Sequence, residues 1–235
     1  MSIAKYKERF DRDGYLLIEN FFDDESMDQL DKIIRDHYGR NPDFSHNDEF
    51  LEKAKTEVVP WFPQQEGVQD FDSIENDKRL HELSDAILGP GWKSQYCMVM
   101  FSKRGTAGQA WHQDCPPDDA SCHNLNRLVY TRDITDELGG QIVIVPGSDK
   151  RGLLPCGDPA GEFDGQVVLR PKKGTLVLLH GHTWHRVLPI RGRYRFSTNF
   201  RAAPQGTPDN ITDVCVYRNM RYRFSTSSVV EDRTV

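Results

Sequence analysis

A run of short apolar segments, separated by turn residues, limits the possible folds more than any other feature of the chain. The segments are shorter than typical helices and rich in β-branched and aromatic residues, which favours strands. Pairs such as Gly139-Gly140 and Pro146-Gly147 mark turns between them. Many short strands at this spacing predict a β-sandwich or barrel. The predicted strands are residues 94–102, 125–132, 140–145, 166–169, 174–179, 185–188 and 194–200, with one more at 213–217 and a polar, mobile tail after it.

The part of the chain before these segments has a more helical pattern. Residues 15–22 predict a strand, and apolar residues three and four apart predict helices over 23–39 and 78–88. Residues 40–77 show no clear period and predict a loop with helical pieces, of the kind that often forms a lid. Trp61 in this loop is either a substrate contact or a buried anchor, and the second reading is favoured.

Composition and charge exclude several classes of protein. The 30 basic and 36 acidic residues give a net charge of −6, which disfavours nucleic acid and anionic membranes as partners. No apolar run approaches the roughly 18 residues of a membrane span. The charged start of the chain lacks the apolar middle of a secretory signal, and the five cysteines lack CxxC spacing, so we expect a cytoplasmic protein with reduced thiols. Clustered arginines could serve a small anion; they are Arg186, Arg191, Arg193, Arg195 and Arg201.

His112 and Asp114 lie two residues apart, so on a strand their side chains project from the same face. Two histidines and one carboxylate on one side of an iron ion leave three adjacent positions open, as an oxygenase needs. A lone His-Xaa-Asp is a weak signal. The chain offers a third ligand downstream, at His180, His182 or His185.

Several segments in order closely resemble the phytanoyl-CoA dioxygenase-like family of iron(II)- and 2-oxoglutarate-dependent oxygenases. They are residues 10–22, 87–91, 111–114, 139–148, and 174–182 with its continuation to Arg195. The resemblance implies a mainly β fold, a double-stranded β-helix or jelly roll, with flanking helices. We therefore expect one domain over residues 1–235, with a mostly helical flank and lid (1–92), a jelly-roll core (93–203) and a C-terminal strand and tail (204–235).

The same resemblance implies roles for individual residues. His112, Asp114 and His185 would hold Fe(II), and Arg195 would pair with the distal carboxylate of 2-oxoglutarate. A guanidinium group matches a carboxylate with two parallel hydrogen bonds. Ser197, on the same strand face as Arg195, either adds a hydroxyl to that carboxylate or is solvated. Tyr130 is a further co-substrate candidate, although a core aromatic is the plainer reading.

The choice of the third metal ligand depends on strand register. If Arg191-Gly192 formed a two-residue hairpin turn, Arg195 would share a face with His182. A bulge or an odd-numbered loop would instead place His185 on that face. The family pattern and a turn at Gly181 favour His185, and His182 remains the alternative.

An intact Asp114 favours hydroxylation, because a halogenating relative would need a small residue there. The implied reaction uses O2 and 2-oxoglutarate, releases succinate and CO2, and hydroxylates an unactivated carbon. The alternative is a jelly-roll metalloprotein that acts as a hydrolase, isomerase or sensor without oxygen chemistry, against which Arg195 argues. The mixture of candidate pocket residues suggests a small polar or anionic substrate, and the oligomeric state stays open. These candidates are Arg104, Gln109, Trp111, Arg127, Trp184 and Arg201.

Overall fold

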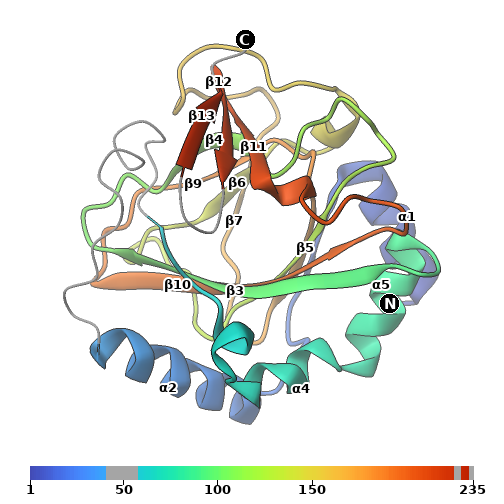
Figure 1. Cartoon of the computed structure of the whole chain (residues 1–235). Coiled ribbons are helices and arrows are strands. Elements are labelled where there is room, and N and C mark those ends of the chain that lie inside the picture. Colours follow the sequence, from blue (N-terminus) through green and yellow to red (C-terminus); the bar gives the residue numbers. More distant parts are fainter. Residues whose placement is uncertain (41–57, 225–228, 233–235) are drawn as a thin grey trace.

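Two antiparallel sheets form the centre of the computed structural model, which describes residues 1–40, 58–224 and 229–232 (Figure 1). The first sheet has the order β1-β8-β5-β10-β3-β2, and the second β13-β12-β11-β4-β9-β6-β7. In chain order the first sheet contains β1 (Tyr15–Ile18), β2 (Val59–Trp61), β3 (Lys93–Lys103), β5 (Leu125–Val129), β8 (Leu176–His180) and β10 (Tyr194–Ala203). The second contains β4 (Gln109–Gln113), β6 (Ile142–Ile144), β7 (Val167–Leu169), β9 (His185–Val187), β11 (Val214–Tyr217), β12 (Met220–Phe224) and β13 (Val229–Asp232).

The chain passes back and forth between the two sheets from β3 to β10. Strands β3, β5, β8 and β10 lie in the first sheet, and β4, β6, β7 and β9 lie in the second. This winding is the double-stranded β-helix, or jelly roll, and it confirms the predicted fold class. Every pairing between the named strands is antiparallel, as expected when each connection returns the chain across the barrel.

Helices cover the outer face of the first sheet (Figure 1). They are α1 (Ile3–Asp13), α2 (Asp24–Arg40), α4 (Asp72–Glu75) and α5 (Lys78–Leu88). Short 3-10 turns occur elsewhere in the chain as well as beside these helices: η1 (Pro63–Glu66), η2 (Gln69–Phe71), η3 (Ser148–Lys150) and η4 (Ile211–Asp213). Helix α5 has the predicted bounds because Asp77 caps it, accepting hydrogen bonds from the backbone of Arg79 and Leu80. The main apolar core lies between these helices and the sheet.

Strand β10 has two different buried faces. Phe196 and Phe200 belong to the core beneath the helices. Because side chains alternate along a strand, the odd-numbered residues from 195 to 201 point the other way, into the space between the two sheets. These residues form what we call the β10 polar row: Arg195, Ser197, Asn199 and Arg201, all at most 6% exposed. A row of buried polar groups inside a barrel is costly unless the groups find partners, so the interior of the barrel is the place to look for the partners of this row.

The structure corrects several expectations about local structure. The first predicted strand ends at Ile18, and residues 3–13 form a helix that the sequence pattern did not reveal. The polar tail carries β12 and β13, which extend the second sheet beyond β11. Their polar composition gives no apolar periodicity from which strands could be predicted; β12 is placed by pairing with β11, and β13 by pairing with β12. Within the predicted lid, residues 41–57 lie outside the described residues.

Trp61 is a buried anchor. It is 4% exposed, its ring stacks on His37 at 3.8 Å, and it meets Phe71 edge to face. This confirms the reading favoured from the sequence. Among the described residues, no helix has both the length and the apolar character that crossing a membrane requires.

Candidate metal centre

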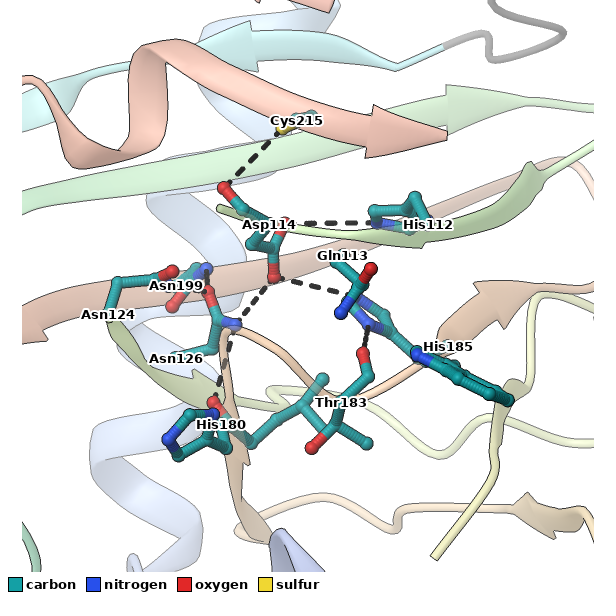
Figure 2. A network of polar contacts seen from close by, with 12 residues as sticks. His112, Gln113, Asp114, Asn124, Asn126, His180, Thr183, His185, Asn199 and Cys215 are labelled. Carbon is teal, nitrogen blue, oxygen red and sulfur yellow. Dashed lines mark hydrogen bonds and ion pairs between the residues drawn. The ribbon is translucent and has the colours of Figure 1, made fainter. Parts of the chain in front are cut away.

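His112, Asp114 and His185 meet where β4 and β9 pair in the second sheet (Figure 2). His112 lies directly opposite His185 in the register, and Asp114 follows β4 immediately. His112 Nε2 is 3.8 Å from Asp114 Oδ1, and His185 Nε2 is 3.5 Å from Asp114 Oδ2. All three side chains are buried, and their ligand atoms lie within 4.8 Å of one another. Such a group can hold a single metal ion.

Backbone carbonyls orient both histidine rings. His112 Nδ1 lies 2.8 Å from the Ala110 carbonyl oxygen, and His185 Nδ1 lies 2.9 Å from that of Thr183. With a proton on Nδ1, each ring donates to its carbonyl and keeps the lone pair of Nε2 free for a metal. Burial, with a contribution from His185, lowers the pKa of His112 to about 3, so this ring is neutral near pH 7.

The carboxylate of Asp114 is ionised. Burial alone would raise its pKa, but the nearby Arg201 guanidinium and the two histidines outweigh that effect and lower the pKa to about 2. One carboxylate and two imidazoles on one side of a cation are the donor set of non-heme Fe(II) oxygenases. The residues present therefore fit a ferrous ion.

Arg195 is a buried cation. It is 4% exposed, its Nε donates to the Gly140 carbonyl at 2.9 Å, and within the described part of the chain it has no acidic partner. Burial lowers the pKa of Arg195, and the interaction with Tyr130 partly offsets this. The hydroxyl oxygens of Tyr130 and Ser197 are also buried; the Tyr130 hydroxyl interacts with Arg195, and the Ser197 hydroxyl has no hydrogen-bond partner. A guanidinium and two hydroxyls in this state suit the carboxylate of a bound small molecule.

Gly140 makes room for Arg195. Its φ is +73°, a conformation that favours glycine, and a Cβ atom there would lie 2.5 Å from Arg195 Cδ. The same residue supplies the carbonyl that accepts from Arg195 Nε. The Gly139-Gly140 pair therefore forms a turn and also helps to position the Arg195 side chain.

His182 does not join the group of ligand atoms. Its ring lies 5.0 Å from that of His180 and 6.0 Å from that of His123, centroid to centroid. Strand β8 ends at His180 and β9 begins at His185, so the predicted turn at Gly181 is present. The prediction that the strands on either side of Arg191-Gly192 pair with each other was wrong, however. Strands β9 and β10 lie in different sheets and do not pair, so neither register proposed across Arg191-Gly192 exists.

Three of the six suggested substrate contacts have structural roles. Trp111 and Trp184 belong to a core cluster with Val143, and their indole nitrogens donate to backbone carbonyls. Arg127 is fully buried on the helix-facing side of β5, where it pairs with Glu75 at 2.6 Å. Arg104 is exposed, and Gln109 is partly buried on β4.

The clustered arginines do not form one surface. Arg191 and Arg193 are exposed, whereas Arg195 and Arg201 face the barrel interior. Arg186 lies over the Trp111 ring at 5.5 Å. Arg191 and Arg193 precede β10, in the connection from β9, whereas Arg195 and Arg201 lie on the strand itself, so closeness in the sequence does not bring these side chains together.

Arg201 and Asn126 contact Asp114. Arg201 Nη2 donates to Asp114 Oδ1 at 2.9 Å, and Asn126 Nδ2 donates to Oδ2 at 2.6 Å. From the sequence, Arg201 was named only as a pocket candidate and as a member of the arginine cluster, and Asn126 was missed. An amide within a predicted core strand was the available signal, because a buried asparagine needs partners.

Comparison with known proteins gives a consistent picture. The family model described as Phytanoyl-CoA dioxygenase (PhyH) matches residues 10–193. The fold is similar to that of the non-heme alpha ketoglutarate dependent epimerase SnoN from nogalamycin biosynthesis (17% identity, 96% of this chain and 87% of that chain, TM-score 0.65). It is also similar to HygX from Streptomyces hygroscopicus with nickel and 2-oxoglutarate bound (15% identity, 85% and 87%, TM-score 0.67). No curated protein sequence matches the chain.

Proposed function

Because the chain belongs to the phytanoyl-CoA dioxygenase (PhyH) family, we propose that it is an Fe(II)- and 2-oxoglutarate-dependent oxygenase. One observation carries this proposal. The buried group of His112, Asp114 and His185 lies in the same barrel as Arg195, a buried arginine that has no acidic partner among the described residues. A hydrolase or a sensor needs the metal ligands but has no use for such an arginine. HygX with nickel and 2-oxoglutarate bound, a protein of the same fold, adds support.

Each residue has a separate task in this proposal. Nε2 of His112, Nε2 of His185 and a carboxylate oxygen of Asp114 would hold Fe(II). When bound, the iron supplies O2 activation coupled to conversion of 2-oxoglutarate into succinate and CO2. Arg195 pairs with the distal carboxylate of 2-oxoglutarate, and the Ser197 and Tyr130 hydroxyls donate to the same group. The barrel walls exclude water and orient the substrate carbon.

We propose hydroxylation of an unactivated carbon in a small polar or anionic metabolite, by a single domain formed from residues 1–235. Solved relatives of this fold have small molecules bound, hygromycin B in HygX and a nogalamycin compound in SnoN. SnoN is an epimerase, and this supports epimerisation as a second candidate outcome, in which hydrogen abstraction leads to inversion of a carbon centre. The two outcomes differ in the product: hydroxylation adds one oxygen atom, and epimerisation leaves the mass unchanged.

The test is reconstitution of the purified protein with Fe(II), 2-oxoglutarate and air. We expect succinate to form only when all three are present, and faster when a metabolite library includes the true substrate. Mass spectrometry of the stimulating metabolite then separates hydroxylation from epimerisation. Substrate conversion that continues without O2 and 2-oxoglutarate would support the hydrolase or isomerase alternative instead.

Replacing Gly140 with alanine should weaken 2-oxoglutarate binding and lower stability. The added Cβ would lie 2.5 Å from Arg195 Cδ and 3.0 Å from Nε, so the guanidinium must move. Strain of this kind costs about 1–3 kcal/mol. Thermal unfolding and 2-oxoglutarate titration measure the two effects.

Gly206→Ala is the matched control. Gly206 also has a positive φ, +88°, but no atom lies within 4 Å of its added Cβ. It should show backbone strain and unchanged 2-oxoglutarate binding. Equal 2-oxoglutarate affinity in both variants would mean that Gly140 does not position Arg195.

A further inference from the structure

Two buried side chains from the first sheet hold the carboxylate of Asp114, which itself follows a strand of the second sheet. Asn126 on β5 donates to Oδ2 at 2.6 Å, and Arg201 on β10 donates to Oδ1 at 2.9 Å. Asn126 is 1% exposed and Arg201 6%. Each carboxylate oxygen therefore accepts one bond from the opposite wall of the barrel.

The orientation of the Asn126 amide is determined by its neighbours. Its Oδ1 accepts from Asn124 Nδ2 at 3.2 Å, Asn199 Nδ2 at 2.8 Å and Arg201 Nε at 3.1 Å. If the amide were turned over, its NH2 group would face three donors. The Asn126 NH2 group must therefore point to Asp114, as Figure 2 shows.

The Arg201 guanidinium is held at three points. Nε bonds Asn126, Nη2 bonds Asp114, and Nη1 donates to the Tyr96 hydroxyl at 2.8 Å. The Tyr96 hydroxyl in turn donates to Thr212 Oγ1 at 3.1 Å. A planar fork bound on three sides cannot rotate, so it presents one fixed edge to the carboxylate.

We propose that Arg201 is a positioning residue, which with Asn126 sets the rotation of the Asp114 carboxylate and so the geometry of the bound metal. The proposal rests on the proposed function, because it takes Asp114 as a metal ligand. A carboxylate oxygen has two lone pairs, and one hydrogen bond to each oxygen leaves the others available. Oδ1 and Oδ2 lie 3.8 and 3.5 Å from the two histidine Nε2 atoms, so the remaining lone pairs can be directed at a shared ion.

A purely electrostatic role for Arg201 predicts the opposite result. The positive guanidinium repels a divalent cation, so if it acted by charge alone, its removal would tighten metal binding. If it acts by orienting Asp114, its removal weakens metal binding and changes the coordination geometry. The sign of the change separates the two roles.

Co(II) is the probe, because its visible absorption reports coordination geometry without any turnover. We expect both Arg201→Met and Arg201→Lys to bind Co(II) roughly 10–100-fold more weakly, the usual effect of losing a partner that orients a metal ligand. Both should also show an altered spectrum, since lysine keeps the charge but cannot bond Asp114, Asn126 and Tyr96 together. Wild-type affinity and spectrum in both variants, or tighter binding by Arg201→Met, would overturn the proposal.

Arg127→Met is the matched control. Arg127 is a fully buried arginine bonded to a carboxylate, that of Glu75, but on the opposite face of the same sheet. It should lower the melting temperature and leave the Co(II) spectrum unchanged. A spectral change as large as that of the Arg201 variants would reduce their effect to general destabilisation and overturn the positioning role.

Tyr96→Phe keeps the test decisive if the Arg201 variants do not fold. It removes only the hydroxyl that holds Nη1, and it should shift the spectrum in the same way but less; a wild-type spectrum would then overturn the proposal. Failure of the proposed function looks different. In that case the unaltered protein binds no Co(II) at a site that His185→Ala removes.

Discussion

Replacing His185 with alanine is expected to remove bound metal and 2-oxoglutarate-dependent succinate formation together. Among the described residues, the proposed site has three protein ligands, and losing one leaves two donors to hold the ion. We expect metal affinity to fall by more than the roughly 10–100-fold typical of losing an outer partner. Metal content of the purified variant and succinate formation after Fe(II) addition measure the two effects.

His182→Ala is the control for this result. It removes a buried histidine three residues away, whose ring contacts His123 and His180 rather than Asp114. We expect this variant to keep its metal, even if its stability falls. Metal loss in His182→Ala with retention in His185→Ala would show that the third ligand has been assigned to the wrong histidine.

Replacing Arg195 with alanine is expected to weaken 2-oxoglutarate binding without removing the metal. Breaking a buried charged pair costs about 3–5 kcal/mol. At 1.4 kcal/mol per factor of ten, binding should be weaker by roughly 100-fold or more. The concentration of 2-oxoglutarate that gives half-maximal succinate formation measures this, alongside Co(II) binding in the absence of 2-oxoglutarate.

Two further variants make the Arg195 result specific. Arg193→Ala removes an exposed arginine two residues earlier and should leave 2-oxoglutarate dependence unchanged. Arg195→Lys keeps the charge but loses the planar fork, so an intermediate effect is expected. If Arg195→Ala retains the normal dependence and Arg193→Ala loses it, the co-substrate carboxylate binds elsewhere.

Much of the secondary structure could be predicted from the sequence, because it depends on interactions between residues close together in the chain. The cap at Asp77 and the glycine after Leu88 set both ends of α5, and these interactions span only a few residues. The positions of β3 and of β5 to β11 followed from apolar content and turn residues, which also act locally, whereas β4, β12 and β13 were not among the predicted strands. The His112-Xaa-Asp114 spacing predicted a shared face, and the ordered segments around it pointed to the family.

Only the tertiary structure decided which strands meet. Strand β9 follows β8 and precedes β10 in the chain, yet it pairs with β4 and β6 in the other sheet, and this pairing brings His185 opposite His112. A turn such as Arg191-Gly192 is compatible with a hairpin or with a crossing between sheets, because its conformation does not depend on the partner strand. Distant packing makes that choice.

The surroundings of each polar side chain were likewise decided in three dimensions. Trp111 and Arg201 both looked like pocket residues, but one packs in the core and the other bonds Asp114 from across the barrel. The sequence did not show which groups Asn126 would bond to, since Asn199 on β10 and Asp114 beyond the end of β4 are distant from it in the chain. The residue type determines which kinds of group a side chain can bond to. The partner that the side chain has in the structure depends on which strands the fold places face to face.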